Sequence, residues 1–424
     1  MKNSQYRAYK GNILYSQDKD TLLSWDNSYI LVQDGIIRGV YRQLPAEFPK
    51  ENLIDWGDRL IIPGFCDMHV HAPQFLQRGL GMDKELLDWL NTYTYPSESK
   101  FSDPEYAEKV YSLFVEELLR QGTLQVNCFP SIHYEASSIL FKLLEKRGLF
   151  AFSGKLNMDQ NSPEYYIEDT EQSLKETERF ITEHLGRSGN NQVAIIPRFT
   201  ITCSEELLAG LGKLVQKYSL PVHSHMCEAV NEMKVVQELF PNYKNGAEIF
   251  AQNNLLGQTP TIMAHCIFMD DDVLELMKNP NCLAVHCPEA TVNINAGGIM
   301  PVKKLLDMGI NLALGSDIGS GANLSIARGI AATIQLSKIR TMYDQEWGAV
   351  NLAEAFYMAT RSGGRYFDKV GAFEEGYCFN ALVIDDNNLP GVGLTSVERL
   401  ERFCYAGDDR NIVERYILGQ EIQL

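Results

Sequence analysis

The stretch Pro63-Gly64-Phe65-Cys66-Asp67-Met68-His69-Val70-His71 divides the chain into two parts with different sequence patterns. Before it, short β segments predominate, such as 29–32 and 36–40 on either side of an Asp34-Gly35 turn signal. After it, apolar strand candidates alternate with amphipathic helices. The stretch therefore predicts the start of an α/β domain, with residues 65–67 as its first strand.

Eight strand candidates follow one another along the chain, separated by helices. The strand candidates are 65–67, 124–128, 149–152, 193–196, 221–223, 261–264, 282–285 and 311–314. Helices are expected at 102–120, where Ser102 and Glu105 suit a capping box, and around 139–144, 171–181 and 207–215. This alternation predicts parallel strands with right-handed crossovers. Eight units favour a TIM-like (β/α)8 barrel, although a doubly wound sheet would give a similar pattern.

The end of the chain returns to a strand pattern at 380–384, which we expect to pair with the N-terminal strands. The predicted organisation is a catalytic barrel over residues 63–368 and a small β-sandwich domain formed by both chain ends, residues 1–62 and 369–424.

Composition narrows the possible partners. The net charge of −17, from 38 basic and 55 acidic side chains, disfavours nucleic acid and anionic membrane surfaces as partners. No apolar run reaches the length of a signal peptide or of a membrane span. The nine cysteines include no CxxC pair, which is typical of a reduced, intracellular chain. We therefore expect a cytoplasmic protein.

The histidines indicate a metal site. His69 and His71 lie two residues apart, so in a strand both rings point to the same side, although such a pair alone is a weak signal. The fifth strand candidate leads to His225, the sixth to His265 and the eighth to Asp317. Because the carboxyl ends of barrel strands meet at one mouth, these residues should come together. Imidazoles with one carboxylate suit zinc, with a position left open for water.

Glu228 stands three residues after His225. If the chain turns there, its carboxylate lies close to the metal without binding it, in the position of a general acid and base. The alternative is a glutamate at a helix N-terminus, placed favourably against the helix dipole, and the two interpretations are compatible.

These segments together resemble the deaminase branch of the amidohydrolase superfamily and, within it, the guanine deaminases. The superfamily resemblance rests on the 63–71 stretch and on Ser224-His225-x-x-Glu228, Ala264-His265, His286-Cys287-Pro288 and Gly315-Ser316-Asp317. The more specific resemblance rests on His71-Ala72-Pro73-Gln74, on residues 86–96 (LLDWLNTYTYP), on residues 154–159 and on Pro197-Arg198-Phe199. The likeness covers nearly the whole chain.

The resemblance implies zinc-dependent hydrolysis of guanine to xanthine and ammonia, a reaction of purine catabolism. The implied ligands of one zinc ion per chain are His69, His71, His225 and Asp317. His265 is then expected to hydrogen-bond the zinc-bound hydroxide, or as a fallback to be a ligand. In this mechanism hydroxide attacks purine C2, Glu228 protonates N3, and Asp317 and Glu228 move protons onto the departing amine.

The resemblance also implies a homodimer. Four further residues are candidates for binding the purine. Arg198 is expected to donate to O6 and N7 of guanine, because its fork fits that pair of acceptors. Gln74 is a second polar contact, and Phe199 or Trp89 would lie against the ring. The alternatives are a structural salt bridge for Arg198 and a core position for the two aromatic residues.

The sequence departs from the family pattern at two places. Pro288-Glu289-Ala290-Thr291 stands where the family usually has Pro-Asn-Ser-Asn, and Cys227 replaces a usual serine. A related ring, such as 8-oxoguanine, a pterin or a triazine, is therefore an alternative substrate. More distant alternatives are a two-metal cyclic amidohydrolase with a carboxylated Lys155 and a non-catalytic scaffold, and we prefer a structural salt bridge for Lys155.

Overall fold

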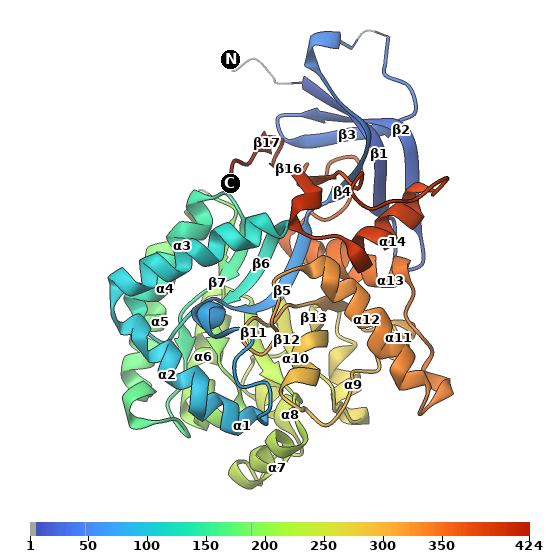
Figure 1. The fold of residues 1–424 in the computed structure, drawn as a ribbon. Coiled ribbons are helices and arrows are strands. Elements are labelled where there is room, and N and C mark those ends of the chain that lie inside the picture. Colours follow the sequence, from blue (N-terminus) through green and yellow to red (C-terminus); the bar gives the residue numbers. More distant parts are fainter. Residues whose placement is uncertain (1–5, 47, 188) are drawn as a thin grey trace.

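The computed structural model describes residues 6–46, 48–187 and 189–424. Residues 1–5 and 47 of the expected β domain, and residue 188 of the expected barrel, lie outside the described residues. The chain ends form a β layer at the top of Figure 1, next to a larger body in which helices surround strands.

The strands from the two chain ends form one seven-stranded sheet, in the order β17-β16-β15-β4-β1-β2-β3. The strands are β1 (Tyr6–Ser16), β2 (Leu22–Gln33), β3 (Ile36–Tyr41), β4 (Leu53–Pro63), β15 (Ala381–Ile384), β16 (Ile412–Ile417) and β17 (Gln420–Glu421). Antiparallel pairing of β15 with β4 confirms that the two chain ends come together. These strands are hydrogen-bonded in one continuous sheet, because β1 pairs with β2 on one side and with β4 on the other, and the expected β-sandwich stays a prediction.

The predicted hairpin joins β2 to β3. Asp34 and Gly35 form its turn, with φ angles of 52° and 82°. Positive φ at both central residues is the geometry that matches the twist of a tight hairpin, and glycine tolerates it without strain.

The larger body contains the predicted parallel strands. They are β5 (Phe65–His71), β6 (Thr123–Phe129), β7 (Phe150–Ser153), β8 (Leu156–Asn157), β9 (Asn191–Val193), β10 (Ile196–Pro197), β11 (Val222–Met226), β12 (Thr261–His265), β13 (Cys282–His286) and β14 (Leu312–Leu314). Parallel pairing links β5-β6-β7-β9, β10-β8 and β11-β12-β13-β14. A parallel bridge from Ile195 to Val222 joins the β9–β10 segment to β11. The prediction of parallel strands is confirmed.

The fourth strand candidate, 193–196, is divided between β9 and β10. Its neighbour is itself interrupted at Gly154-Lys155, so β9 pairs with β7 and β10 pairs with β8. A Cβ on Gly154 would lie 2.0 Å from the carbonyl oxygen of Ala194, so only glycine allows this close approach.

Helices cover the outside of the parallel strands (Figure 1). The four predicted helices are α3 (Pro104–Arg120), α4 (Tyr134–Lys146), α5 (Thr170–His184) and α6 (Glu205–Tyr218). The others are α1 (Leu86–Trp89), α2 (Tyr95–Glu98), α7 (Val230–Leu239), α8 (Gly246–Gln252), α9 (Asp271–Met277), α10 (Pro288–Asn293), α11 (Val302–Asp307), α12 (Ile326–Thr341), α13 (Leu352–Tyr357) and α14 (Ser396–Ala406).

The expected capping box at Ser102 is wrong. Asp103 caps α3 instead, accepting a hydrogen bond from the backbone of Glu105, and Ser102 belongs to a preceding 3-10 turn. Pro104 sets this boundary, because its fixed φ and missing N–H suit the first position of a helix.

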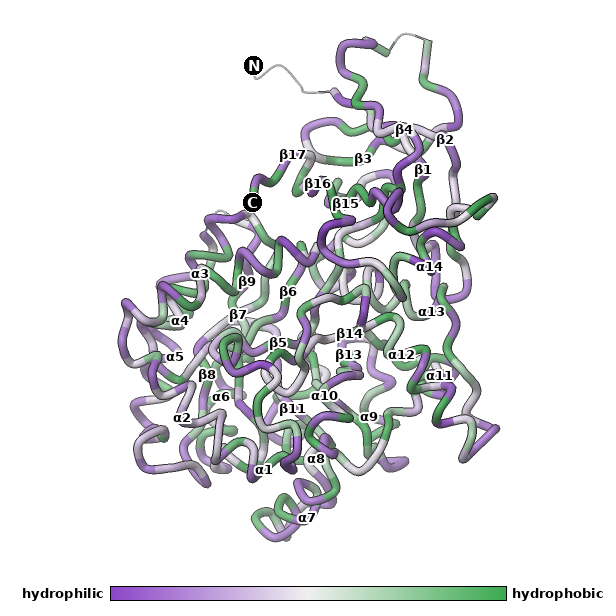
Figure 2. The backbone as a smooth tube through the Cα atoms, viewed as in Figure 1, coloured by the Kyte–Doolittle hydropathy of each residue, from purple (hydrophilic) through white to green (hydrophobic). Residues whose placement is uncertain are grey.

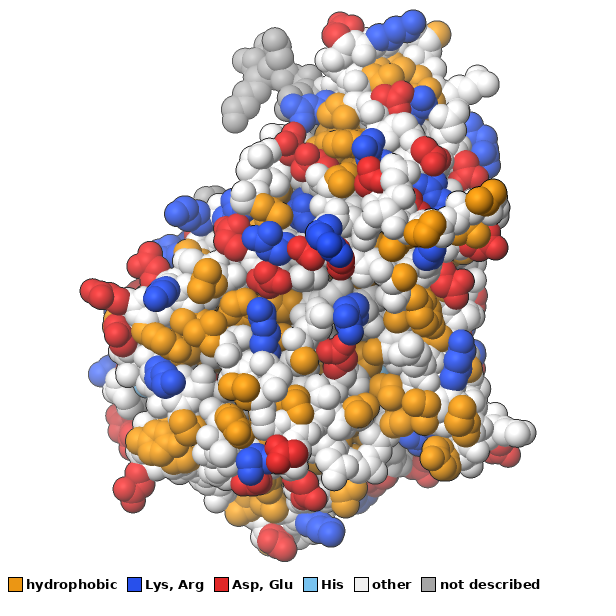
Figure 3. Space-filling model, in the orientation of Figure 1, with side chains coloured by type: hydrophobic (Ala, Val, Ile, Leu, Met, Phe, Trp, Pro, Cys, Tyr) orange, Lys and Arg blue, Asp and Glu red, His pale blue; other side chains and the backbone are white. Residues whose placement is uncertain are grey.

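The strands and the inner faces of the helices supply the core. Every residue of β5, β6, β11, β12 and β13 is buried, and helices such as α3 and α4 alternate hydrophilic and hydrophobic residues along their length (Figure 2). On the face shown in Figure 3, acidic and basic side chains are interspersed. Among the described residues, no helix is both long and apolar enough to cross a membrane.

Candidate functional site

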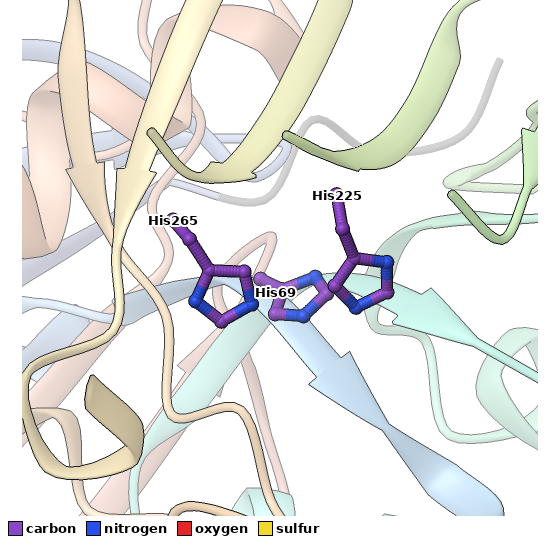
Figure 4. Close-up of side chains that lie close together, drawn as sticks. All are labelled: His69, His225 and His265. Carbon is purple, nitrogen blue, oxygen red and sulfur yellow. The ribbon is translucent and has the colours of Figure 1, made fainter. Parts of the chain in front are cut away.

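Side chains from the ends of four parallel strands converge on one cluster. β5 supplies His69 and His71, β11 supplies His225, β12 supplies His265, and the segment after β14 supplies Asp317. The Nε2 atoms of His71 and His225 lie 3.0 Å apart. Asp317 Oδ1 lies 3.3 Å from His69 Nε2 and 3.4 Å from His71 Nε2. Figure 4 shows the rings of His69, His225 and His265 converging from separate strands.

The hydrogen bonds of His225 and His69 leave one ring nitrogen of each without a hydrogen on it or without a partner at the cluster. His225 Nδ1 donates to the carbonyl oxygen of Arg198 at 2.6 Å, so its Nε2 carries the lone pair. His69 Nδ1 pairs with His223 Nε2 at 2.9 Å, which leaves the buried His69 Nε2 without a hydrogen bond. A buried ring nitrogen without a partner is costly, and a metal ion satisfies it. The arrangement fits a metal site.

The protonation of the histidines fits the same conclusion. Burial lowers the pKa of His69 to about 3 and lowers the pKa values of His71, His225 and His265 well below the ordinary 6.5. These imidazoles are therefore neutral at physiological pH, which is the form that binds metal ions.

Three overlapping groups of side chains in the described part of the chain have ligand atoms within 4.8 Å of one another. They are His69 with His225 and His265, His69 with His71 and Asp317, and His265 with Cys287 and Asp317. The four expected ligands are divided between the first two groups. The geometry is compatible both with His265 as a ligand and with His265 as a hydrogen-bonding neighbour.

Glu228 lies beside this cluster, with Oε1 3.4 Å from His265 Nε2. Burial raises the pKa of Glu228 well above its ordinary value, and the nearby carboxylates of Asp317 and Glu232 raise it further. Its backbone N–H donates to Glu232 Oε2 at 2.5 Å, one turn into α7. Glu228 precedes Ala229, the N-cap of that helix, so the acid that caps the helix is Glu232. Glu228 is left free to hold a proton in the site.

Asp317 is held by short polar contacts. Ser320 Oγ donates to Asp317 Oδ2 at 2.6 Å, and the backbone N–H of Asp317 donates to the carbonyl oxygen of His69 at 2.8 Å. Burial raises the pKa of Asp317 to about 6, while His265 and Ser320 oppose the shift.

The backbone around the cluster is locally strained. Cys227, His265 and Asp317 adopt positive φ angles of 54°, 71° and 47°. Such angles are uncommon for residues other than glycine and persist where the surroundings hold them, often at functional sites. Here they mark the points where the chain leaves β11, β12 and β14 to form the site.

A pocket opens beside the cluster. Its lining residues are His71, Gln74, Leu86, Trp89, Leu90, Arg198, Phe199, His225, Glu228, Asp317 and Ser320. All four expected substrate contacts are in this set. Leu86, Leu90 and Ser320 were not predicted.

Arg198 both lines the pocket and forms the salt bridge considered as its alternative role. Its Nη1 donates to Glu98 Oε2 at 2.6 Å, and both side chains are almost fully buried. Burial alone would lower the pKa of Arg198, but Glu98 raises it above the ordinary value. The salt bridge is therefore confirmed, a role of Arg198 in binding the ring stays a prediction, and Glu98 is a residue that the sequence did not single out.

Two neighbours of the histidines also escaped prediction. His223 orients His69, as described above, and the ring of Phe129 lies 4.2 Å from that of His223 and 4.7 Å from that of His71 between ring centroids. Phe129 thus forms an apolar floor beneath the imidazoles. The sequence signal was weak, since His223 ends the strand candidate 221–223 and Phe129 directly follows the candidate 124–128.

Lys155 and Glu289 lie apart from the cluster. Lys155 Nζ pairs with Glu168 and donates to the carbonyl oxygen of Leu156, so it forms the structural salt bridge that we preferred over a metal-bridging role. Glu289 lines a separate cavity with Arg328, so its difference from the family pattern does not alter the described wall of the pocket.

Comparisons with known proteins place the chain among related sequences. A model of the amidohydrolase family matches residues 60–422. The chain is 35% identical to a guanine deaminase of Dictyostelium discoideum, over 99% of each chain. It is 33% identical to the guanine deaminase of Homo sapiens, over 85% of this chain and 82% of that one. A crystal structure of guanine deaminase from C. acetobutylicum, with guanine bound in its active site, is 44% identical, with a TM-score of 0.97 over 99% of this chain and 100% of that chain.

Proposed function

The chain belongs to the amidohydrolase family, and within it to the guanine deaminases, and from this we propose that it hydrolyses guanine to xanthine and ammonia with one zinc ion per chain. One observation carries the proposal. The polar side chains suited to an oxopurine, Gln74 and Arg198, line the same pocket as Glu228 and the histidine–aspartate cluster.

The residues that would hold zinc are His69, His71, His225 and Asp317. Zinc in such a site acts as a Lewis acid and supplies a nucleophile derived from water near neutral pH. We assign His265 to the neighbouring position, where its Nε2 lies between Glu228 and Asp317 and can hydrogen-bond the attacking water.

Glu228 and Asp317 move the protons. Burial raises the pKa of Glu228 and so favours its protonated form, which would deliver a proton to ring N3 as water attacks C2. Asp317, held by Ser320, accepts a proton from the water. Asp317 then passes its proton to the exocyclic amine, and Glu228 takes the remaining hydroxyl proton from C2 as ammonia leaves, so both carboxyl groups return to their starting states and guanine and water become xanthine and ammonia. Trp89 and Phe199 would confine the ring between them.

Several larger-scale features belong to the same proposal. The strands β5 to β14 would close into a (β/α)8 barrel, because Asp317 after β14 donates to His69 in β5. Residues 63–368 would form the catalytic domain, and 1–62 with 369–424 the small β domain. A homodimer in the cytoplasm, acting in purine catabolism, follows from the family resemblance.

Ammonia release from purified, zinc-loaded protein tests the proposal. Guanine should be the preferred substrate over adenine, cytosine, 8-oxoguanine and a pterin. Glu228→Gln should lower kcat by about 10²–10⁴-fold, the usual contribution of a general acid and base, with zinc content unchanged. Preference for another ring would overturn the substrate but keep the chemistry. Inactivity towards every ring, with zinc bound, would overturn the proposed activity.

A further inference from the structure

Behind the pocket wall lies a carboxylate that holds both polar groups expected to recognise the ring. Glu98, the last residue of α2, is fully buried. Its Oε1 accepts from Gln74 Nε2 at 2.8 Å and from Arg198 Nη2 at 3.3 Å, and its Oε2 accepts from Arg198 Nη1 at 2.6 Å. A third partner, Tyr166, donates from its hydroxyl to Oε2 at 2.8 Å.

These contacts occupy all the acceptor positions of the Glu98 carboxylate. A carboxylate has about four acceptor positions, and four donors from Gln74, Arg198 and Tyr166 occupy them. Burial excludes water as a competing partner, so Glu98 can change none of its contacts without leaving a buried donor unpaired.

The orientation of the Gln74 amide follows from this arrangement. A carboxylate paired with a guanidinium accepts hydrogen bonds and donates none, so the amide NH2 must face Glu98. Gln74 Oε1 must then face away from Glu98, and it is buried without a hydrogen-bond partner in a residue that lines the pocket. Gln74 therefore offers the ligand an acceptor only.

Arg198, in contrast to Gln74, offers the ligand hydrogen-bond donors only. Its guanidinium has five N–H donors, of which two meet Glu98 and one or more are left for a ligand, and it has no acceptor. Glu98 also balances its positive charge in the buried wall, so recognition there depends on hydrogen bonds rather than on a net charge.

We propose that Glu98 is a positioning residue that sets the hydrogen-bond pattern of the pocket and thereby selects a 6-oxopurine over a 6-aminopurine. Guanine presents an acceptor at O6 and a donor at N1–H, which match Arg198 and Gln74 Oε1. A 6-amino ring presents a donor at C6 and an acceptor at N1, and mismatches both. The inference deepens the proposed function and rests on it.

The test compares guanine with 2,6-diaminopurine in wild-type protein and in Glu98→Gln. The two rings lose the same 2-amino group and differ at C6 and N1 alone. In Glu98→Gln the side chain at position 98 can donate as well as accept, so Gln74 can turn its NH2 toward the pocket. We expect KM for guanine to rise about 10–100-fold, with a smaller change in kcat, because a buried polar contact is lost. The kcat/KM preference for guanine over 2,6-diaminopurine should fall at least about tenfold.

A matched control separates positioning from general damage to a buried ion pair. Glu168→Gln breaks the largely buried pair with Lys155 without touching the pocket, and should leave the guanine preference unchanged. Gln74→Met provides a second route to the same answer, since it removes the acceptor while keeping the volume, and it should lower the preference even if Glu98→Gln does not fold. If both effects pass through Gln74, the double variant should lose less than the sum of the two single losses.

The possible results of these measurements distinguish failure of the role of Glu98 from failure of the proposed function. A folded Glu98→Gln protein with wild-type KM and wild-type preference would overturn the role of Glu98, as would an unchanged preference in Gln74→Met. Wild-type protein that releases no ammonia from guanine would instead overturn the proposed function.

Discussion

At the scale of single residues, Asp67 links two of the chain segments that carry the expected metal ligands, β5 and the segment after β14. It is fully buried, and Oδ1 accepts from the backbone N–H of Ser316 at 3.0 Å and of His69 at 3.3 Å. Its Oδ2 accepts from the Ser316 hydroxyl. Burial raises the pKa of Asp67 to about 7, and the hydrogen bonds from Ser316 and His69 oppose that shift. Asp67 therefore fixes the position of Asp317 relative to His69.

Removing this carboxylate should weaken both stability and metal binding. Asp67→Ala leaves buried donors of Ser316 and His69 unpaired, so we expect the free energy of unfolding to fall by about 2–4 kcal/mol in urea titrations. Zinc affinity should fall about 10–100-fold, the usual cost of losing a group that orients a ligand. Asp67→Asn keeps one acceptor oxygen and should lose less. Wild-type zinc affinity in Asp67→Ala would contradict this role.

The metal site was more predictable than the pocket wall, for a physical reason. Histidines are few, and their positions at the ends of predicted strands, as for His225 and His265, indicate one site even without knowledge of the pairing. Acidic residues are common on any surface, and Glu98 lies 100 residues from Arg198 in the chain. No local pattern distinguishes Glu98 from a solvated glutamate, so its role emerges only from the fold.

At the scale of elements, His184, the last residue of α5, makes the stability of the packing between α5 and α4 depend on pH. His184 is almost fully buried, with its ring centroid 4.4 Å from that of Phe180 and 4.7 Å from that of Phe141. Its Nε2 lies 3.2 Å from Ser138 Oγ in α4. Burial, aided by the charges of Arg187 and Lys142, lowers the pKa of His184 to about 4.

The sign of the resulting pH dependence follows from the two states. The unfolded chain binds a proton at His184 below a pH of about 6.5, whereas the folded chain stays neutral there down to about 4. Stability from this residue is thus present above pH 6.5 and is lost as the pH falls towards 4. His184→Gln cannot titrate, so the unfolding free energy of wild-type protein should fall by about 1–2 kcal/mol more than that of the variant between pH 7 and 4.5.

Urea unfolding of both proteins at several pH values measures this difference. His133→Gln is a useful comparison, since the surface of His133 is only partly buried and its pKa is lowered less than that of His184, so it should contribute less. Parallel stability curves for wild-type protein and His184→Gln would show that α5 and α4 are not coupled to pH through this ring.

The positions of the elements were predictable and their ends were not. Apolar runs between amphipathic helices located the parallel strands, because burial on both faces demands such runs. The boundaries depended on contacts that local patterns do not encode. Asp103 rather than Ser102 caps α3, and the close approach of Gly154 to Ala194 divides the fourth strand.

At the scale of the whole molecule, the C-terminal strands bind the small sheet to the helical layer. Arg415 in β16 is buried and donates to the carbonyl oxygens of Leu119 and Arg120 at the end of α3. The carbonyl oxygen of Leu119 also accepts from the backbone N–H of Gly122 at 3.1 Å, and a cation at the C-terminus of a helix is favourable. Pairing of the chain ends was predictable from their shared strand pattern, but the single sheet was not, since its order depends on contacts hundreds of residues apart.

The expected metal site also joins distant parts of the chain, so metal removal should lower the stability of the whole fold. His69, His225 and Asp317 come from segments separated by up to 248 positions, and without a metal ion their neutral nitrogens and the carboxylate lack full compensation. An ion that binds only the folded chain stabilises it by RT ln(1 + [L]/Kd), about 4 kcal/mol at a thousand times Kd. Chelation should therefore lower Tm by several degrees and abolish ammonia release, and one equivalent of zinc should restore both.

Calorimetry of chelated and zinc-loaded protein, with metal analysis of each sample, measures the effect. The variant His69→Ala provides the control, because the loss of one ligand should remove most of the zinc-dependent rise in Tm while leaving the distant sheet of both chain ends unchanged. Two zinc ions per chain at saturation would contradict the single-metal site. An equal Tm with and without zinc would mean that the cluster is stable as a hydrogen-bonded histidine network, held by contacts such as His69 with His223.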